Sequence, residues 1–140
     1  MAILAATDKG HELMLAGFCK NATDVTQFLA SLWNDTIVGT DDLSDLQNEM
    51  NSGTESGYAR ITIEASGTGW PTLALDSSEM QIQSKTVTFT ATGAWTNPFT
   101  AVGILANMAT DALFLYSNVP STTLSNGDSF AVTVKFKLTK

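Results

Sequence analysis

Apolar and polar residues alternate with a period of two along much of the chain after residue 57. The clearest run covers residues 129–139, where five apolar positions share one face: Phe130, Val132, Val134, Phe136 and Leu138. Residues 58–65 and 86–92 alternate in the same way, and the polar face of residues 86–92 consists of threonines. Strands that are buried on one face and solvated on the other are typical of antiparallel sheets.

Five further segments bring the predicted strands to about eight. Residues 27–33 are apolar on both faces, which indicates a strand that is central or is covered by the N-terminal helix. The weaker candidates are Thr72–Asp76, Glu79–Gln83, Thr100–Ala106 and Ala112–Ser117. No helical crossovers separate the later strands, so a doubly wound α/β fold is excluded. We therefore expect a mainly-β protein, an antiparallel β-sandwich of jelly-roll type with a short helical N-terminal part.

Two short helices are predicted before the sandwich. The first covers residues 7–16 and ends at Gly17, and the second covers residues 40–50 with Thr40 as its N-cap. We expect one compact domain in two parts, with residues 1–57 forming an arm, helices and one strand that pack on a sandwich of residues 58–140. The expected core of the sandwich is Ile61, Ile63, Val87, Phe89, Phe130, Val132, Val134 and Phe136.

Charge limits the partners that the chain can bind. Charged residues make up 15% of the sequence, below the usual level of about 25%, and the formal net charge is −7. Seven basic residues cannot neutralise a run of phosphates, and an anionic membrane would repel the chain, so neither nucleic acid nor membrane is an expected partner. The apolar start, residues 1–6, is too short for a signal peptide or a membrane span, which predicts a protein kept in the cytoplasm.

The sequence offers little chemistry. It has a single histidine, His11, and a single cysteine, Cys19, and it lacks nucleophile-elbow, phosphate-loop and zinc motifs. Three aspartates, Asp41, Asp42 and Asp45, lie close together, but their spacing does not match a calcium-binding hand, and helix capping explains them better. We therefore expect no cofactor, no metal and no enzyme.

One enzymatic alternative stays open. Glu64, Asp76 and Glu79 flank a loop that carries Trp70, and a pair of carboxylates beside a tryptophan is a candidate glycoside hydrolase site. The separation of the carboxyl groups decides this alternative, because hydrolases hold the pair about 5–10 Å apart.

The order of several short motifs resembles small structural proteins of tailed bacteriophages. The motifs, over Ser56 to Leu138, are Gly57-Tyr58-Ala59-Arg60, the strand Phe89–Thr92 followed by Gly93-Ala94-Trp95, Ala101–Leu105, Leu113–Tyr116, and Asn126-Gly127-Asp128 before the last strand. The turn at residues 108–111 departs from the pattern, because it lacks the usual glycine. The resemblance implies a virion component with a jelly-roll-like sandwich.

The resemblance also implies a function and partners. The expected function is that of a capsid decoration, or cement, protein, which is assembled in the bacterial host cytoplasm, forms a homotrimer and binds the major capsid protein. The apolar residues Met1 to Ala6 are then available as an arm that reaches a neighbouring subunit or the major shell protein, with Met1, Ala2, Ile3 and Leu4 as candidate contact residues. The alternative is a tail-associated adhesin or fibre component, in which Trp70 and Trp95 stack on host surface glycans.

Overall fold

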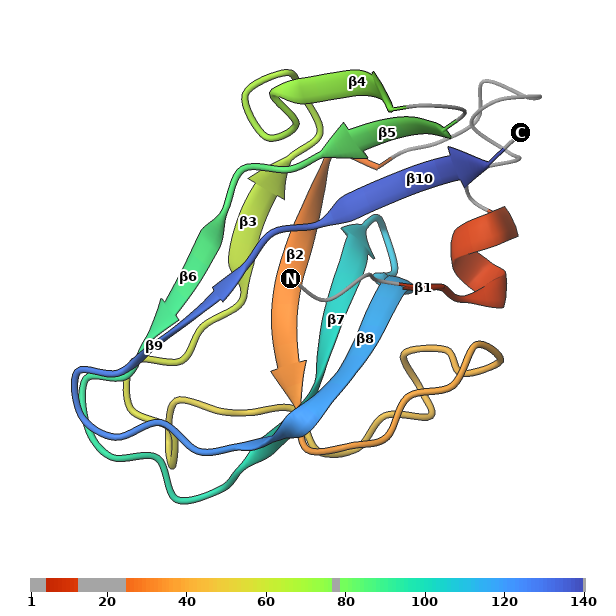
Figure 1. Ribbon diagram of the computed structural model, residues 1–140. Helices are drawn as coiled ribbons and strands as arrows, with labels where there is room; N and C mark the ends of the chain where they lie inside the picture. Colours follow the sequence, from red (N-terminus) through yellow and green to blue (C-terminus); the bar gives the residue numbers. More distant parts are fainter. Residues whose placement is uncertain (1–4, 13–24, 77–78, 140) are drawn as a thin grey trace.

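The computed structural model describes residues 5–12, 25–76 and 79–139, and these residues form an antiparallel β-sandwich (Figure 1). One sheet has five strands in the order β1-β8-β7-β2-β3, a second has the order β10-β5-β4, and a two-stranded ribbon pairs β6 with β9. The strands are β1 (Ala5–Ala6), β2 (Gln27–Trp33), β3 (Ile61–Glu64), β4 (Thr72–Asp76), β5 (Glu79–Gln83), β6 (Val87–Thr90), β7 (Phe99–Asn107), β8 (Ala112–Thr122), β9 (Ser129–Val132) and β10 (Lys135–Thr139).

Each of the eight predicted strands is present, and the mainly-β sandwich class is confirmed. Two differences bring the strands described to ten. The predicted last strand is divided into β9 and β10, and the two-residue β1 pairs with β8 at Leu115 and Tyr116. The helical part is smaller than the sequence indicated: the described residues contain one short helix, which begins at Asp8. Gly17 and Cys19 lie outside the described residues.

The prediction of a helix at residues 40–50 is wrong. This segment is a chain of turns that aspartate side chains organise. Asp42 accepts hydrogen bonds from the backbone N–H and the hydroxyl of Ser44, and Asp45 accepts one from the backbone N–H of Asp42 at 2.9 Å. Such local side-chain bonds offer the backbone an alternative to helical hydrogen bonds, and here the alternative is adopted. The hydrogen bonds from Ser44 also lower the pKa of the Asp42 carboxyl.

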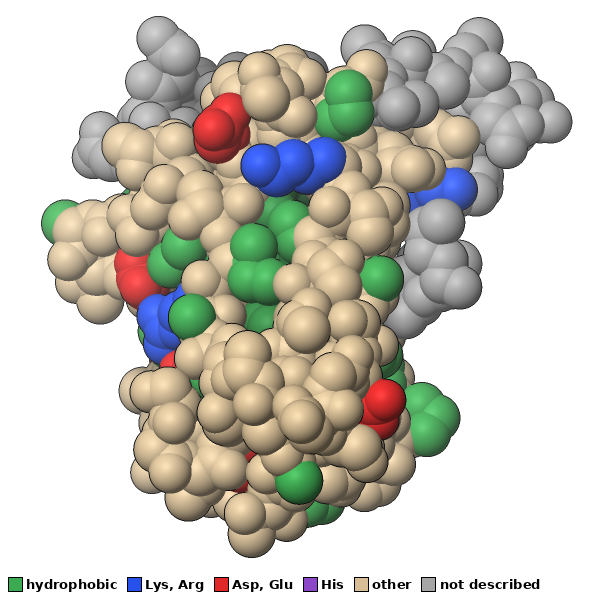
Figure 2. Space-filling model, turned by 90° about the vertical axis from the view of Figure 1, so that its left-hand side faces the viewer, with side chains coloured by type: hydrophobic (Ala, Val, Ile, Leu, Met, Phe, Trp, Pro, Cys, Tyr) green, Lys and Arg blue, Asp and Glu red, His purple; other side chains and the backbone are tan. Residues whose placement is uncertain are grey.

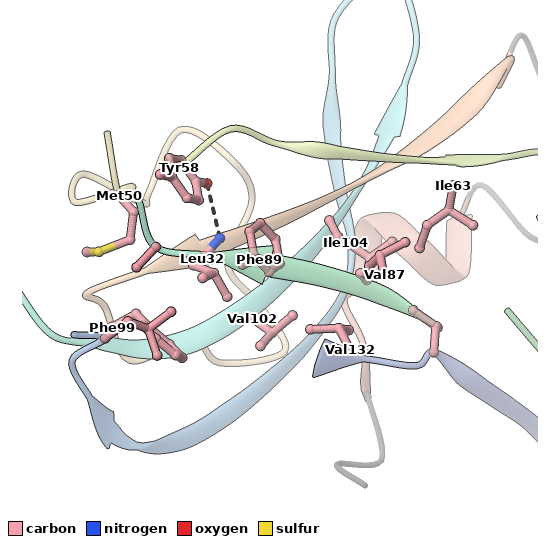
Figure 3. Packing of buried hydrophobic residues seen from close by; sticks show 14 of the residues in the cluster. Leu32, Met50, Tyr58, Ile63, Val87, Phe89, Phe99, Val102, Ile104 and Val132 are labelled. Carbon is pink, nitrogen blue, oxygen red and sulfur yellow. Dashed lines mark hydrogen bonds between the residues drawn. The ribbon is translucent and has the colours of Figure 1, made fainter. Parts of the chain in front are cut away.

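The main core lies between the five-stranded sheet and the β6–β9 ribbon (Figures 1 and 3). Apolar side chains of β2, β3 and β7 meet those of the ribbon there, and Phe99, Leu32 and Ile104 are almost completely buried. Of the predicted core, Ile63, Val87, Phe89, Val132 and Val134 are buried, whereas Ile61 and Phe130 are partly buried at the rim. The side chain of Phe136 lies outside the described part of the chain.

The opposite face of the five-stranded sheet is covered by the segment 34–50. Ile37 and Leu46 from this segment pack against Trp33, Leu105 and Leu113 of the sheet. Strand β2 is therefore apolar on both faces because it lies between β3 and β7 and has a layer on either side. The sequence had placed residues 1–57 as a part that packs on the sandwich, but β2 is an integral strand of its largest sheet.

A bulge causes the break between β9 and β10. Lys135 is paired with Gln83 and Val132 with Val87, so three residues on one strand oppose two on the other. The backbone N–H of Ser84 donates to the Val134 carbonyl at 2.9 Å, and the Ser84 hydroxyl accepts from the Val134 N–H at 2.9 Å. An extra residue of this kind bends the strands, which separates the β6–β9 ribbon from the sheet formed by β4, β5 and β10.

Candidate interaction surface

The outer face of the β6–β9 ribbon carries no charged side chain. Because side chains alternate along a strand, the burial of Val87, Phe89 and Val132 turns their neighbours outward. The outward residues of the two strands and their flanks are Thr86, Thr88, Thr90, Ser129, Ala131 and Thr133. All are exposed except Thr133, which is partly exposed. The register brings the two rows side by side and pairs Thr88 with Ala131 at the centre.

Hydroxyl groups link the two rows of this face. The hydroxyls of Thr86 and Thr133 lie 2.7 Å apart, and those of Thr90 and Ser129 lie 3.0 Å apart. In both pairs either oxygen can donate, so each hydroxyl keeps hydrogen-bonding capacity for a further partner. We name these six outward residues the hydroxyl face. Figure 2 looks at the molecule from the side of the ribbon and shows a mostly tan surface, with hydrophobic side chains gathered near its centre and a few charged side chains around them.

Aromatic side chains support the ribbon from beneath. The ring of Tyr58 stacks on Phe89, with centroids 5.8 Å apart, and Phe99 contacts Phe130 edge-on at 4.8 Å. The Tyr58 hydroxyl accepts a hydrogen bond from the backbone N–H of Leu32 and donates one to Glu49 (the first bond is dashed in Figure 3). Burial raises the pKa of this phenol far above its usual range, so it stays a donor at any physiological pH. Aromatic contacts of this kind hold the hydroxyl face in one shape.

A buried carboxylate organises the loop beside the ribbon. Glu55 is fully buried and accepts hydrogen bonds from four donors: the backbone N–H groups of Asn51 and Asn97, the Asn97 side-chain amide and the Thr54 hydroxyl. Burial acts to raise the pKa of Glu55, but the hydrogen bonds from Thr54, Asn51 and Asn97 together outweigh it and leave the pKa below its usual value. Glu55 is therefore a structural anion that ties residues 51–55 to the loop after β6.

A second polar cluster connects three segments of the chain. Arg60 forms two hydrogen bonds with Glu49, at 2.8 and 2.7 Å, and a third with Asp111 at 3.2 Å. The hydrogen bonds with Glu49 raise the pKa of the Arg60 guanidinium. All three charged groups have a partner, so the cluster joins the segment before β3 to the turn between β7 and β8. Arg60 and Tyr58 of the Gly-Tyr-Ala-Arg motif therefore both form hydrogen bonds that hold the fold together.

The two candidate tryptophans differ in their surroundings. Trp95 is 5% exposed, and its indole N–H donates to the carbonyl of Ser56 at 3.0 Å. The prediction that Trp95 stacks on a sugar is therefore wrong: its ring packs edge-on against Tyr58 and Phe99 in the core. Trp70 is half-buried and meets Phe28 edge-on, with ring centroids 5.5 Å apart, so part of its surface faces solvent.

The other predicted sites are placed as follows. Met1, Ala2, Ile3 and Leu4 lie outside the described residues, whereas Ala5 and Ala6 of the predicted arm form β1 and pair with β8. Among the three carboxylates of the hydrolase alternative, Asp76 and Glu79 are paired in the β4–β5 register, while Glu64 lies on β3 in another sheet. The side chains of Asp76 and Glu79 fall outside the described part, so the carboxyl separation stays untested. His11 is exposed in the short helix.

No group of three or more potential metal ligands occurs within residues 5–12, 25–76 and 79–139. Over the same ranges, no helix is long and apolar enough to span a membrane. An open hollow of about 740 Å³ lies between the 42–44 turn, the 108–112 turn and Lys9. Each of its three charged side chains already has a partner: Lys9 pairs with Glu12, Asp111 pairs with Arg60, and Asp42 accepts hydrogen bonds from Ser44.

The sequence predicted the two polar rows of the hydroxyl face separately, but not that they lie side by side. The threonines of residues 86–92 and the polar side of residues 129–133 are visible as alternation, whereas their pairing depends on the register of β6 with β9. Glu55, Glu49 and Asp111 gave no signal, because each is an isolated acidic residue in a loop. No protein-family model and no curated protein matches this chain.

Proposed function

We propose that this chain is a non-enzymatic structural component of a bacteriophage virion, and that it acts as a capsid decoration protein. The observation that carries the proposal is the hydroxyl face, a rigid and uncharged surface on a protein whose net charge is −7. The cores of protein interfaces are depleted in charged side chains, since burying an unpaired ion costs far more free energy than burying a hydroxyl group that has a hydrogen-bond partner.

The rest of the chain fits a shell component. The described residues form a single sandwich around one main core, and the part of β8 beyond its pairing with β1 is protected. At the β8 edge, Asn118 bonds both the N–H and the carbonyl of Ile37, at 2.9 and 2.8 Å, and Pro120 removes a donor. This stretch of β8 is therefore blocked from pairing with a strand of another chain.

In this proposal the major capsid protein is the main partner and the decoration unit is a homotrimer. Residues 1–4 form the arm that reaches the neighbouring subunit or the shell, and β1 ties the base of the arm to β8. The resemblance in motif order to small phage proteins supports this assignment; neither nucleic acid nor membrane is a partner in it.

The test is binding of purified protein to phage shells that lack it. We expect the wild-type protein to bind in saturable amounts and to raise the temperature at which the shells open. A variant that lacks residues 1–4 should keep its circular dichroism spectrum and melting temperature but bind more weakly. Unchanged affinity of this variant would refute the arm, and failure of the wild type to bind any shell would refute the decoration function.

A second candidate function is glycan binding by a tail-associated adhesin. The half-buried ring of Trp70 favours it, because an aromatic face that is partly open to solvent can stack on a sugar. A glycan array distinguishes the two functions. Binding that Trp70→Ala abolishes would favour the adhesin, and the matched exposed substitution Thr62→Ala on β3 serves as the control.

A further inference from the structure

We propose that the hydroxyl face is the contact surface for the same face of a second copy of this chain, in a two-fold arrangement. This inference uses the same hydroxyl face that carries the proposed function, but it assigns the face to a contact between two copies, and its test is separate from shell binding and from the trimer.

The first argument is the self-complementarity of the groups on the face. A two-fold contact places one patch against an identical patch, so the patch must complement itself. Carboxylates only accept hydrogen bonds and ammonium groups only donate them, and two faces of either kind repel each other. Hydroxyl groups do both, and five of the six residues of the face carry one. The face can therefore pair with its own copy without an unsatisfied group.

The second argument is charge. The chain carries 14 acidic and 7 basic residues, so two copies repel each other over most of their surfaces. The hydroxyl face contains none of these 21 residues. At its ends the sequence places opposite charges: Lys85 and Lys135 flank the bulge end, and Asp128 precedes β9 at the other end. An antiparallel two-fold arrangement brings the basic end of one copy beside the acidic end of the other.

The third argument is the low entropic cost of the contact. Threonine, serine and alanine have short side chains that lose little rotamer freedom when they become buried. The two hydroxyl pairs already fix four of the six side chains, with oxygen separations of 2.7 and 3.0 Å. The aromatic layer beneath the ribbon fixes the backbone. The face therefore resembles the preorganised surfaces that bind with little rearrangement.

The size of the face sets the expected strength. A stable interface buries about 800 Å² on each partner, which is more than six small side chains provide. The hydroxyl face is therefore the centre of the contact, and neutral side chains around it on the side shown in Figure 2 complete it. A contact of this kind is weak between free subunits and becomes effective where an assembly holds many copies together.

The experiment measures self-association of the full chain by analytical ultracentrifugation up to millimolar concentration. We expect reversible association of the wild type. Thr88→Glu places a carboxylate at the centre of the face and should raise the dissociation constant at least about 100-fold. Thr88→Lys should do the same, and an equimolar mixture of the two variants should associate again. Thr62→Glu, on an exposed position of β3, should leave the dissociation constant unchanged.

The outcomes separate clearly. Loss of association in each variant, with recovery in the mixture, supports the proposal. A wild type that stays monomeric at millimolar concentration overturns it, as does a Thr88→Glu variant that associates like the wild type. Equal loss in Thr88→Glu and Thr62→Glu would also overturn it, because net charge alone would then explain the effect. If the chain forms a trimer whose stability Thr88→Glu does not change, the two-fold contact is refuted and the decoration function is unaffected. Far-ultraviolet circular dichroism verifies the fold of each variant.

Discussion

Replacing Glu55 with glutamine should destabilise the fold by about 3 kcal/mol. Glutamine keeps the shape of the side chain, but it loses the charge and turns one acceptor oxygen into a donor. In the better of its two orientations, the new amide faces the backbone N–H of Asn51 and the hydroxyl of Thr54. The hydroxyl can turn to accept, whereas the N–H of Asn51 is left without an acceptor.

The magnitude follows from these bonds. One orphaned donor costs about 1–3 kcal/mol, and the remaining bonds weaken because a charged acceptor contributes about 1.5–3 kcal/mol against about 0.5–1.5 for a neutral one. The loop is near the surface, with exposed residues on both sides of Glu55, so the lower part of the summed range applies. For a chain of this length, about 3 kcal/mol corresponds to a fall of roughly 10 °C in Tm.

Urea unfolding followed by tryptophan fluorescence measures the change, with the exposed Glu64→Gln on β3 as the matched control. The comparison also has a pH signature. The folded pKa of Glu55 is lowered from 4.5, so its stabilisation is present above that pH and is lost as the pH falls through the folded pKa. The difference between wild type and Glu55→Gln should therefore shrink below about pH 4. Equal stabilities of the wild type and Glu55→Gln at pH 7 would refute the role of Glu55.

Two further substitutions test the polar links of the sandwich. Arg60→Met should lower the free energy of unfolding by about 2 kcal/mol, because its ion pairs with Glu49 and Asp111 are only 22–31% exposed. Lys9→Met, which removes the exposed pair with Glu12, should change the free energy of unfolding by less than about 0.5 kcal/mol. Equal effects of Arg60→Met and Lys9→Met in urea unfolding would contradict the stabilising role of the Arg60 cluster. Ser84→Ala should cost about 1–2 kcal/mol, since it leaves the buried N–H of Val134 without its acceptor, whereas Ser66→Ala should be neutral. If calorimetry finds Ser84→Ala as stable as the wild type, the Ser84 hydroxyl does not stabilise the bulge.

Period-two alternation predicted the strands that have one buried face, such as β6, whereas β2 and β7 are buried on both faces and do not show it. The same signal could not reveal the bulge: Val134 continues the alternation of Phe130 and Val132, and the interruption depends on Ser84, which lies between β5 and β6. The segment 40–50 illustrates the opposite failure. Its leucines lie at helical spacing, but Asp42 and Asp45 bond to nearby backbone N–H groups and fix turns instead.

The candidate site was predictable only in part, for a physical reason. Exposure of an aromatic residue depends on what packs over it, and nothing in the sequence around Trp95 indicates that Tyr58 and Phe99 surround its ring. The polar rows of the hydroxyl face were visible, yet a surface exists only once the register sets them side by side. The buried Glu55 has no periodic signature, since its four donors come from residues 51, 54 and 97.

The most direct test of the proposed function is the copy number of this chain in virus particles purified from the source of its gene. Quantitative mass spectrometry against isotope-labelled peptides gives the ratio of this chain to the major capsid protein. A decoration protein predicts a fixed ratio of the same order as the number of capsid subunits, and a tail adhesin predicts only a few copies per particle. Particles that contain no copy of the chain would contradict the assignment to the virion.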